Sequence, residues 1–301
     1  MLSSETGIPG SGTQKTDHCS EIGRLPESAC SVPAMRTELW IADTERLALD
    51  SQLERMLPLL TAAETEKVLR FRRREDRLRC AVGRLLIRAL AAEQLGRADA
   101  PLQLSEYGKP SFMGENAVHF NLSHAGDLVV LAYGNLPLGV DVEKRRAIAW
   151  RELASSFSAE EQALLEADED PLGLFYRFWT VREAFSKEEG LGLPIFESGD
   201  MVMDYGSGTV CYHDRTLRFR TWELSGYTLS VCASRLDAIR LCRLSSEGWN
   251  RVLTCNGGTD LLKREEKLEK EFESLDGGGM RLNRIAQTVS FMRYERKTAE
   301  R

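Results

Sequence analysis

Two short segments carry charged side chains whose types and spacing could handle phosphate. Asp141 and Glu143 alternate with valines, which is the period of a half-buried strand, so both carboxylates should fall on one face roughly 7 Å apart. Glu183 and Lys187 are one helical turn apart. Mg²⁺ takes one or two carboxylates together with phosphate oxygens and water. The three acidic residues could therefore hold Mg²⁺. Equally, they could be an outward strand face and a solvated Glu–Lys pair at the favourable i,i+4 spacing.

A helix over 172–189 must position Glu183 and Lys187. Its apolar residues recur at helical spacing on one narrow face, namely Leu174, Phe178, Val181 and Phe185. Glu183 and Lys187 fall on the far side, and Gly190 is a typical helix end. If this helix packs across the acidic strand, it supplies the third carboxylate of the site.

Strand patterns also precede the acidic pair. The segments 118–124 and 138–143 alternate in polarity, and 128–133 is apolar throughout. Short turns between them predict a meander that ends at the acidic pair. We expect its last strand to bury its valines and to keep Asp141 and Glu143 on the outward face.

The first of these strands ends in polar residues that could contact phosphate. Asn121, Ser123 and His124 offer amide, hydroxyl and imidazole groups, although all three could be ordinary turn residues. A serine beside a histidine also raises a nucleophile–base pair. No Gly-x-Ser-x-Gly motif surrounds Ser123, so a hydrolase of that type is disfavoured.

A basic segment lies further towards the N-terminus. The pattern predicts one long helix over 61–95, with Thr61 and Glu64 at capping-box spacing. Its first half carries the cations Lys67, Arg70, Arg72, Arg73, Arg74, Arg77 and Arg79. Such a run is either a solvated face or an anion site. Downstream, a Gly-Lys-Pro sequence predicts a turn that holds Lys109 at its tip.

Composition narrows the class of protein. The 301 residues carry a formal charge of −6, which argues against general nucleic-acid binding. The seven cysteines show no CxxC spacing and indicate reduced cytosolic thiols. No apolar run reaches the roughly 18 residues of a membrane span, and no secretory signal is present. We expect a cytoplasmic protein with no nucleic-acid or membrane partner.

The helices and strands divide the chain into four parts. Residues 1–35 have the composition of a disordered leader. Residues 36–145 and 146–240 each show helices followed by strands, which predicts an α+β fold of two similar halves. Residues 241–301 are predicted to be an appended tail, with a helical pattern over 261–275.

Taken together, these segments resemble the 4′-phosphopantetheinyl transferase superfamily, in its larger single-chain, surfactin-synthetase-activating type. The resemblance runs from about Leu39 to about Ala233. Its carriers are Gly83–Arg88 within the basic helix, Gly108–Pro110, Phe120–His124, Gly139–Glu143 and Phe178–Lys187 with Gly190. It implies a monomer of two pseudo-twofold-related halves with the active site between them.

The resemblance also implies residue roles. Members transfer the phosphopantetheine arm of coenzyme A to a serine of an apo acyl or peptidyl carrier protein, with Mg²⁺ as cofactor, and release 3′,5′-adenosine bisphosphate. The metal ligands would be Asp141, Glu143 and Glu183; Glu183, or a water that it holds, would be the base, and Lys187 would assist the leaving phosphate. The implied coenzyme A contacts are Lys67, Arg70, Lys109, Asn121, Ser123, His124 and Lys187.

Two departures and two alternatives accompany this assignment. Arg182 stands where the family usually has Lys, and Glu64 stands where a further cation is common, so both bear on coenzyme A affinity. A non-catalytic coenzyme A or carrier-protein binding module would lack a metal carboxylate, yet all three are present. Another Mg²⁺-dependent phosphotransferase or nuclease would not need the Gly108–Pro110 and Asn121–His124 motifs.

Overall fold

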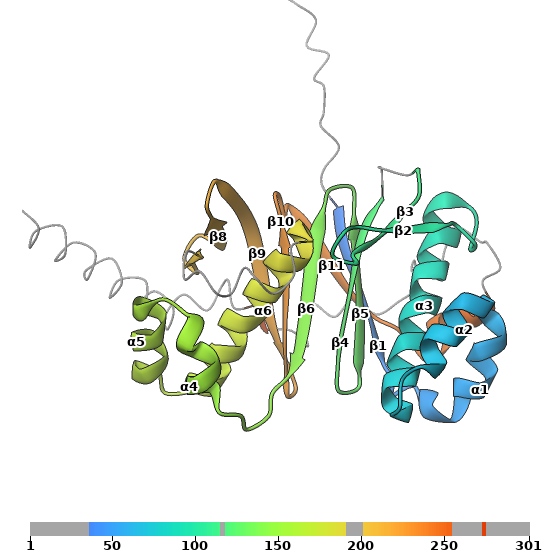
Figure 1. The fold of residues 1–301 in the computed structure, drawn as a ribbon, viewed down its shortest axis with the longest axis horizontal. Coiled ribbons are helices and arrows are strands. Elements are labelled where there is room, and N and C mark those ends of the chain that lie inside the picture. The colour runs from blue at the N-terminus through green and yellow to red at the C-terminus, as the bar shows by residue number, and fades with distance from the viewer. Residues whose placement is uncertain (1–35, 115–117, 191–200, 255–272, 275–301) are drawn as a thin grey trace, which may run out of the picture. The chain divides into compact units, whose positions relative to one another are not determined.

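The computed structural model describes residues 36–114, 118–190, 201–254 and 273–274. They form an α+β fold built on two main sheets and a small β2–β3 hairpin (Figure 1). The leader predicted over 1–35 and the helical pattern over 261–275 fall outside the described residues, except for 273–274.

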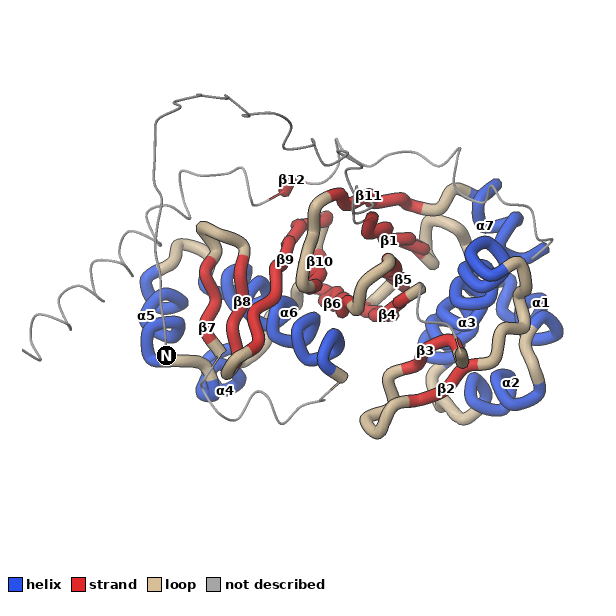
Figure 2. The backbone as a smooth tube through the Cα atoms, turned by 90° about the horizontal axis from the view of Figure 1, so that it is seen from above, coloured by secondary structure: helices blue, strands red, loops and turns tan. Residues whose placement is uncertain are grey.

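The first sheet has the strand order β11-β1-β5-β4. Its strands are β1 (Arg36–Asp43), β4 (His119–Ala125), β5 (Leu128–Gly134) and β11 (Ala238–Arg243). The helices on this side are α1 (Leu53–Met56), α2 (Ala62–Leu69), α3 (Arg74–Leu95) and α7 (Ser246–Thr254), and the hairpin strands are β2 (Leu102–Leu104) and β3 (Pro110–Phe112). The long helix α3 buries an apolar face against this sheet, and Figure 2 shows the helices grouped on one side of it.

The second sheet has the order β6-β10-β9-β8-β7. Its strands are β6 (Leu138–Lys144), β7 (Val202–Asp204), β8 (Thr209–Tyr212), β9 (Arg215–Leu224) and β10 (Tyr227–Ala233), and β12 (Glu273–Ser274) pairs with β9. Helices α4 (Trp150–Leu153), α5 (Ala159–Ala167) and α6 (Pro171–Glu189) belong to this half. Helix α6 covers β6 and β10, while the opposite faces of β6, β9 and β10 share a core with β1 and β5.

Helix α6 has the bounds that its local sequence signals predict. The Asp170 side chain accepts a hydrogen bond from the Gly173 N–H at the start, and Gly190 ends the helix with φ 70°. The predicted apolar face is buried at Leu174, Phe178, Val181 and Phe185. At Gly139 of β6 an added Cβ would lie 2.0 Å from the Ala184 carbonyl oxygen. A glycine is therefore required where this strand meets the helix.

The single helix predicted over 61–95 is wrong. The capping box of Thr61 and Glu64 is present, but α2 ends at Leu69. Arg73 then has extended backbone, and α3 begins at Arg74. Both helices bury side chains in the same core, which requires α2 to turn back against α3. No glycine or proline marks the break, so the charged pattern runs through it.

The predicted meander and the boundary at 241 also need correction. Strands β5 and β6 belong to different sheets, so the turn between them crosses from one half to the other. Residues 238–243 form β11, which pairs in parallel with β1. Helix α7 follows and buries Trp249 and Val252 in the core of the first half. Residues up to Thr254 are therefore integral to the fold, because they complete a sheet and its core.

Candidate active site

Strands β4 and β6 lie side by side at the junction of the two halves and are joined by side chains. The Asn121 carboxamide oxygen accepts a hydrogen bond from the Val140 N–H at 2.9 Å. The Ser123 hydroxyl accepts one from the Val142 N–H at 3.2 Å. These bonds satisfy buried amides of β6, which belongs to a different sheet from β4. Two residues predicted to contact coenzyme A thus also join the halves.

Asp141 lies at this junction and is only 3% exposed. Its Oδ1 accepts hydrogen bonds from the Ser123 hydroxyl at 2.9 Å and from the Lys187 ammonium at 2.5 Å. Its Oδ2 is buried and has no hydrogen-bond partner among the described residues. The expectation that Asp141 stands on an outward face is wrong, because α6 covers this face of β6 and β4 lies along its edge.

Lys187 points to β6 and not along its own helix. Its Nζ lies 2.5 Å from Asp141 Oδ1 and 3.1 Å from Ser123 Oγ. Within the described part of the chain, no ion pair of 4.0 Å or less joins Lys187 to Glu183. The alternative of a solvated i,i+4 pair is therefore wrong for these two residues, since the ammonium neutralises a carboxylate on the facing strand.

The other two carboxylates, Glu143 and Glu183, resist ionisation. Burial raises the pKa of Glu143 to about 7, and the charges of Asp141 and Glu183 add to the shift while Lys187 opposes it. Burial and then the charge of Asp141 also raise the pKa of Glu183, again against Lys187. The indole of Trp179 donates a hydrogen bond to Glu143. Carboxylates that resist ionisation together are stabilised as anions by a bound cation.

The donor set fits a hard cation. Asp141, Glu143 and Glu183 offer carboxylate oxygens, the ligand type that Mg²⁺ prefers, and the orphaned Oδ2 of Asp141 is a buried acceptor that still needs a partner. No group of three His, Cys, Asp or Glu side chains within residues 36–254 that the structure describes already has metal-site geometry. The Lys187 ammonium instead donates a hydrogen bond to Oδ1, the other oxygen of Asp141.

His124 follows Ser123 on β4, on the side of α3. The residue is exposed, but partial desolvation by the surrounding protein lowers its pKa, and the charge of Arg79 lowers it further. Arg79 donates to the Gly126 carbonyl at 2.7 Å and pairs with Asp76. The sequence placed Arg79 only within a basic run. Its spacing from Asp76 on α3 gave no sign that it reaches the end of β4.

Lys109 is drawn into the junction as well. Its Nζ donates to the Glu188 carbonyl at 2.7 Å and to the Leu138 carbonyl at 3.2 Å, and burial lowers its pKa. Gly108 with φ 82° forms the predicted turn. The ammonium therefore ties the β2–β3 region to the C-terminal end of α6, the helix that carries Glu183, and to the start of β6.

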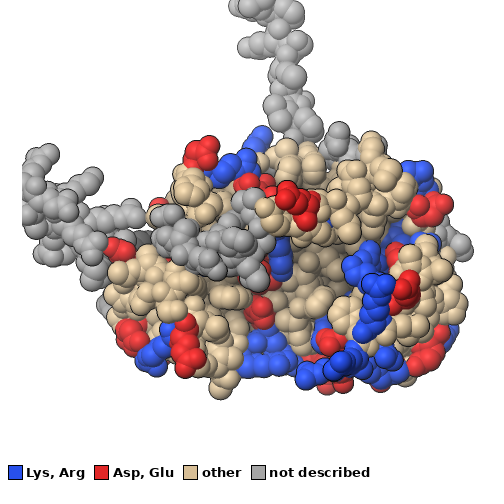
Figure 3. Space-filling model, viewed as in Figure 1, with Lys and Arg blue, Asp and Glu red and all other residues tan. Residues whose placement is uncertain are grey.

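Lys67 and Arg70 lie on the exposed surface of α2, away from these contacts. Arg70 caps the end of α2 and pairs with Glu66 at 2.6 Å. Lys67 is within electrostatic reach of Cys80 on α3. Lys and Arg side chains gather over the α2–α3 side of the molecule in Figure 3, beside the hollow at the centre of that view. Both residues remain predicted coenzyme A contacts.

Arg182 points away from the carboxylates. It pairs with Glu161 of α5 at 2.5 Å and lies 4.0 Å above the ring of Phe157, with 3% of its surface exposed. Its replacement of the family's usual lysine is therefore a packing feature of the second half. The effect of Arg182 on coenzyme A affinity stays a prediction.

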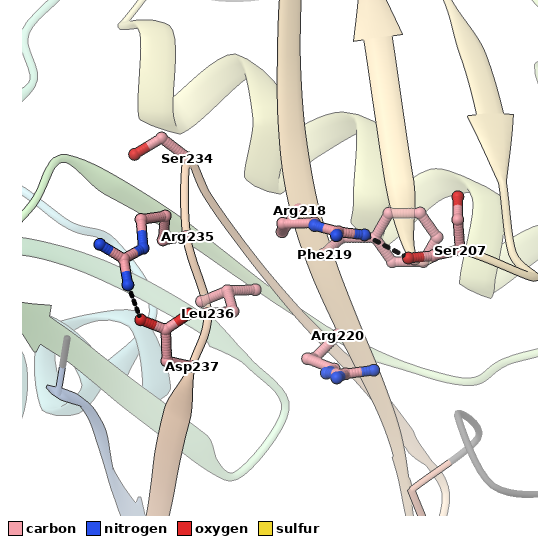
Figure 4. Close-up of a pocket in the computed structure, with 9 residues that line it drawn as sticks. Ser207, Arg218, Phe219, Arg220, Ser234, Arg235, Leu236 and Asp237 are labelled. Atoms are coloured by element: carbon pink, nitrogen blue, oxygen red, sulfur yellow. Dashed lines mark hydrogen bonds and ion pairs between the residues drawn. The ribbon is translucent and has the colours of Figure 1, made fainter. Parts of the chain in front are cut away.

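A separate basic pocket of about 360 Å³ lies where β9 meets the β10–β11 connection (Figure 4). Arg218 donates to the Ser207 carbonyl at 2.7 Å, and Arg235 pairs with Asp237 at 2.5 Å. The protein's own acceptors bind these guanidinium groups. We therefore take Asp141, Glu143 and Glu183, called the carboxylate cluster below, as the candidate site and not this pocket.

Comparisons with known proteins cover both halves. Residues 48–135 match the family described as 4′-phosphopantetheinyl transferase, N-terminal, and residues 137–232 match the 4′-phosphopantetheinyl transferase superfamily. The chain is 33% identical over 202 residues to the 4′-phosphopantetheinyl transferase ffp of Bacillus subtilis, covering 64% of this chain and 90% of that protein. It is 32% identical over 199 residues to Sfp of Bacillus subtilis strain 168, covering 61% and 86%. Among the described residues, no helix is long and apolar enough to span a membrane.

Proposed function

Because the chain belongs to the 4′-phosphopantetheinyl transferase superfamily, we propose that it transfers the phosphopantetheine arm of coenzyme A to a serine of an apo carrier protein. The second product is 3′,5′-adenosine bisphosphate. The observation that carries this proposal is the convergence of acidic side chains from β6 and α6 with Lys187 between the two halves.

The reaction is a displacement at phosphorus, so the protein acts mainly by positioning groups and by neutralising charge. We propose that Asp141, Glu143 and Glu183 hold Mg²⁺. When bound, this ion neutralises charge on the pyrophosphate and on the oxygens around the reacting phosphorus.

The proton of the carrier serine needs an acceptor. Glu183 is our candidate, directly or through a water that it holds, because its raised pKa brings it closer to the range that suits a general base. Lys187 steadies the leaving phosphate. For this the ammonium must exchange part of its contact with Asp141 for the pyrophosphate.

Coenzyme A is assigned to the surface between α2–α3 and the β3–β4 region. Lys67 and Arg70 offer charge from α2, and Ser123, His124 and Lys109 lie at the junction. Asn121 shapes the end of β4 by holding the Val140 amide. We further propose that the protein acts in the cytoplasm as a monomer, with coenzyme A and a carrier protein as its partners and without nucleic acid or membrane.

The decisive experiment is intact-mass spectrometry of an apo carrier protein incubated with the chain, coenzyme A and Mg²⁺. We expect the carrier to gain one phosphopantetheine. A carrier whose acceptor serine is replaced by alanine should stay unmodified, and EDTA should suppress the reaction. The proposal fails if the carrier gains no mass while Sfp of Bacillus subtilis modifies the same sample.

A further inference from the structure

Glu223 on β9 joins two guanidinium groups that come from the two elements of the carboxylate cluster. Its Oε1 lies 2.6 Å from Nη2 of Arg145, which directly follows β6. The same oxygen accepts a hydrogen bond from Nε of Arg177 on α6 at 2.7 Å. The three side chains are 19–26% exposed, so this bridge is partly shielded from solvent and salt.

Arg145 fixes the strand end that carries Glu143. Its backbone N–H donates to the Gly226 carbonyl at 2.8 Å, and its Nε donates to the Thr228 hydroxyl at 2.9 Å. Thr228 is the direct partner of Glu143 in the β6–β10 ladder. A movement of Arg145 would therefore shift the strand at the carboxylate itself.

Arg177 fixes the helix that carries Glu183. It lies on α6 close to Trp179, whose indole bonds Glu143, and Tyr176 next to it accepts a hydrogen bond from the Arg146 N–H at 3.1 Å. This end of α6 is thus held against the end of β6. At the other end, Gly139 and Ala184 make the close backbone contact that fixes the opposite side of the cluster.

Two contacts hold β6 against α6 on the side of Asp141, namely the ion pair of Lys187 with Asp141 and the close backbone approach of Gly139 to Ala184. The bridge at Glu223 lies on the side of Glu143, where it joins the end of β6 to α6.

We propose that Glu223 is a positioning residue that sets the separation of Glu143 and Glu183 and thereby the affinity for Mg²⁺. The inference rests on the metal site of the proposed function. Groups that orient metal ligands typically change metal affinity 10–100-fold when they are lost. Because Glu223 acts through two other side chains, we expect an effect of about tenfold, at the lower end of that range.

The test measures Mg²⁺ binding directly by calorimetric titration of the full chain, without coenzyme A or carrier protein. Glu223→Gln keeps the shape and removes the charge. We expect its Mg²⁺ dissociation constant to rise about tenfold, while the KM for coenzyme A at saturating Mg²⁺ stays within about twofold. Glu223→Asp should recover part of the affinity.

The matched control is Glu38→Gln in the first half. Glu38 is 3% exposed, against 26% for the Glu223 side chain, and it accepts a hydrogen bond from Tyr133 and pairs with the exposed Arg36. Glu38→Gln therefore removes an ion pair on β1, a strand that carries none of the three carboxylates. Its Mg²⁺ affinity should equal that of the wild type even if its melting temperature falls. A second measurement pairs Glu223→Gln with Arg177→Gln, whose effects on Mg²⁺ affinity should be less than additive.

The outcomes separate the two ideas. If the wild type binds no Mg²⁺, the metal site of the proposed function is wrong, and the role of Glu223 falls with it. If the wild type binds Mg²⁺ and Glu223→Gln binds it equally well, only the positioning role is overturned. Equal losses in Glu223→Gln and Glu38→Gln would likewise overturn it, because they would indicate general destabilisation.

Discussion

The ammonium of Lys187 lies 2.5 Å from the carboxylate of Asp141 on the facing strand. This contact joins α6 to β6 across the proposed site and occupies one of the two oxygens of Asp141. A phosphate or a cation that binds here must therefore replace contacts that Asp141 and Lys187 already make with each other. The predictions below test how these charges are shared.

Asp141→Asn should lower transfer by about two to three orders of magnitude, the cost of removing one preorganised electrostatic group. The amide keeps the shape of the side chain, and it also relieves repulsion with Glu143 and Glu183. It also breaks the ion pair with Lys187, so we expect a lower melting temperature in EDTA than that of the wild type. Activity within about threefold of the wild type would contradict the metal assignment.

The stability of the metal-free protein should fall as the pH rises from about 4.5 to about 7. The folded pKa of Glu143 is about 7 against an ordinary value of 4.5, so the folded state binds more protons than the unfolded state in this window and is favoured at its acidic side. Urea unfolding in EDTA at pH 5.5 and pH 8 measures the effect. Glu143→Gln should reduce the slope, and the rest should come from Glu188, whose pKa burial and the neighbouring Glu189 also raise to about 7.

Mg²⁺ should reverse that trend, because it binds the ionised carboxylates. We expect the rise in melting temperature on adding Mg²⁺ to be larger at pH 8 than at pH 5.5. An equal rise at both values, or a larger one at pH 5.5, would mean that the ion binds elsewhere.

Lys67→Ala should raise the KM for coenzyme A about ten- to hundredfold and leave kcat nearly unchanged. A charge-assisted phosphate contact is worth roughly 1.5–3 kcal/mol, at about 1.4 kcal/mol per decade, and it is made equally in the ground and transition states. Arg70→Ala should have a smaller effect, since Glu66 already engages Arg70. Steady-state kinetics with varied coenzyme A distinguishes these outcomes from a loss of kcat.

Lys187→Ala should show the opposite division and lower kcat far more than it raises KM. Charge on the leaving phosphate grows only as the bond breaks, so its stabilisation belongs to the transition state. The same kinetics at saturating Mg²⁺ provides the measurement. A pure KM effect would assign Lys187 to ground-state binding alone.

Gly139→Ala should destabilise the fold by roughly 1–3 kcal/mol or more, the range for overpacking. The new Cβ would lie 2.0 Å from the Ala184 carbonyl oxygen and 2.4 Å from the Glu188 nitrogen, so α6 would have to move. Gly206→Ala is the control, because its nearest neighbour is a side-chain oxygen of Asp204 at 3.2 Å. Urea unfolding of both variants should show a loss only for Gly139→Ala.

Local signals in the sequence were sufficient for α6 and for the strand alternation of β6. The apolar face and Gly190 predicted the helix, and the structure adds the Asp170 cap at its start. The strand alternation and the helix pattern also identified Asp141, Glu143 and Glu183 as candidate metal ligands, and the family resemblance implied the same role. The roles proposed for them stay predictions until the experiments above are done.

Long-range contacts could not be predicted in this way. Asp141 bonds Ser123, which lies on a strand of the other sheet. The Lys187 side chain contacts Asp141 and not Glu183 because β6 faces α6 in the folded protein. The bonds from Asn121 and Ser123 to β6 amides replace a backbone ladder, and no periodicity encodes them. The arginine bridge at Glu223 likewise joins segments that only the tertiary fold brings together.

The parallel pairing of β11 with β1 has a consequence for synthesis of the protein on the ribosome. The first strand emerges early, but its outer neighbour β11 and the helix α7, which packs near α3, are made only after strands β6 to β10 of the second sheet. Domains generally fold as units and in N-terminal order during translation. Here we expect the reverse order, in which the later half matures first and the earlier half waits with part of its core open. A nascent chain arrested before residue 238 should therefore protect β10 from proteolysis sooner than β1.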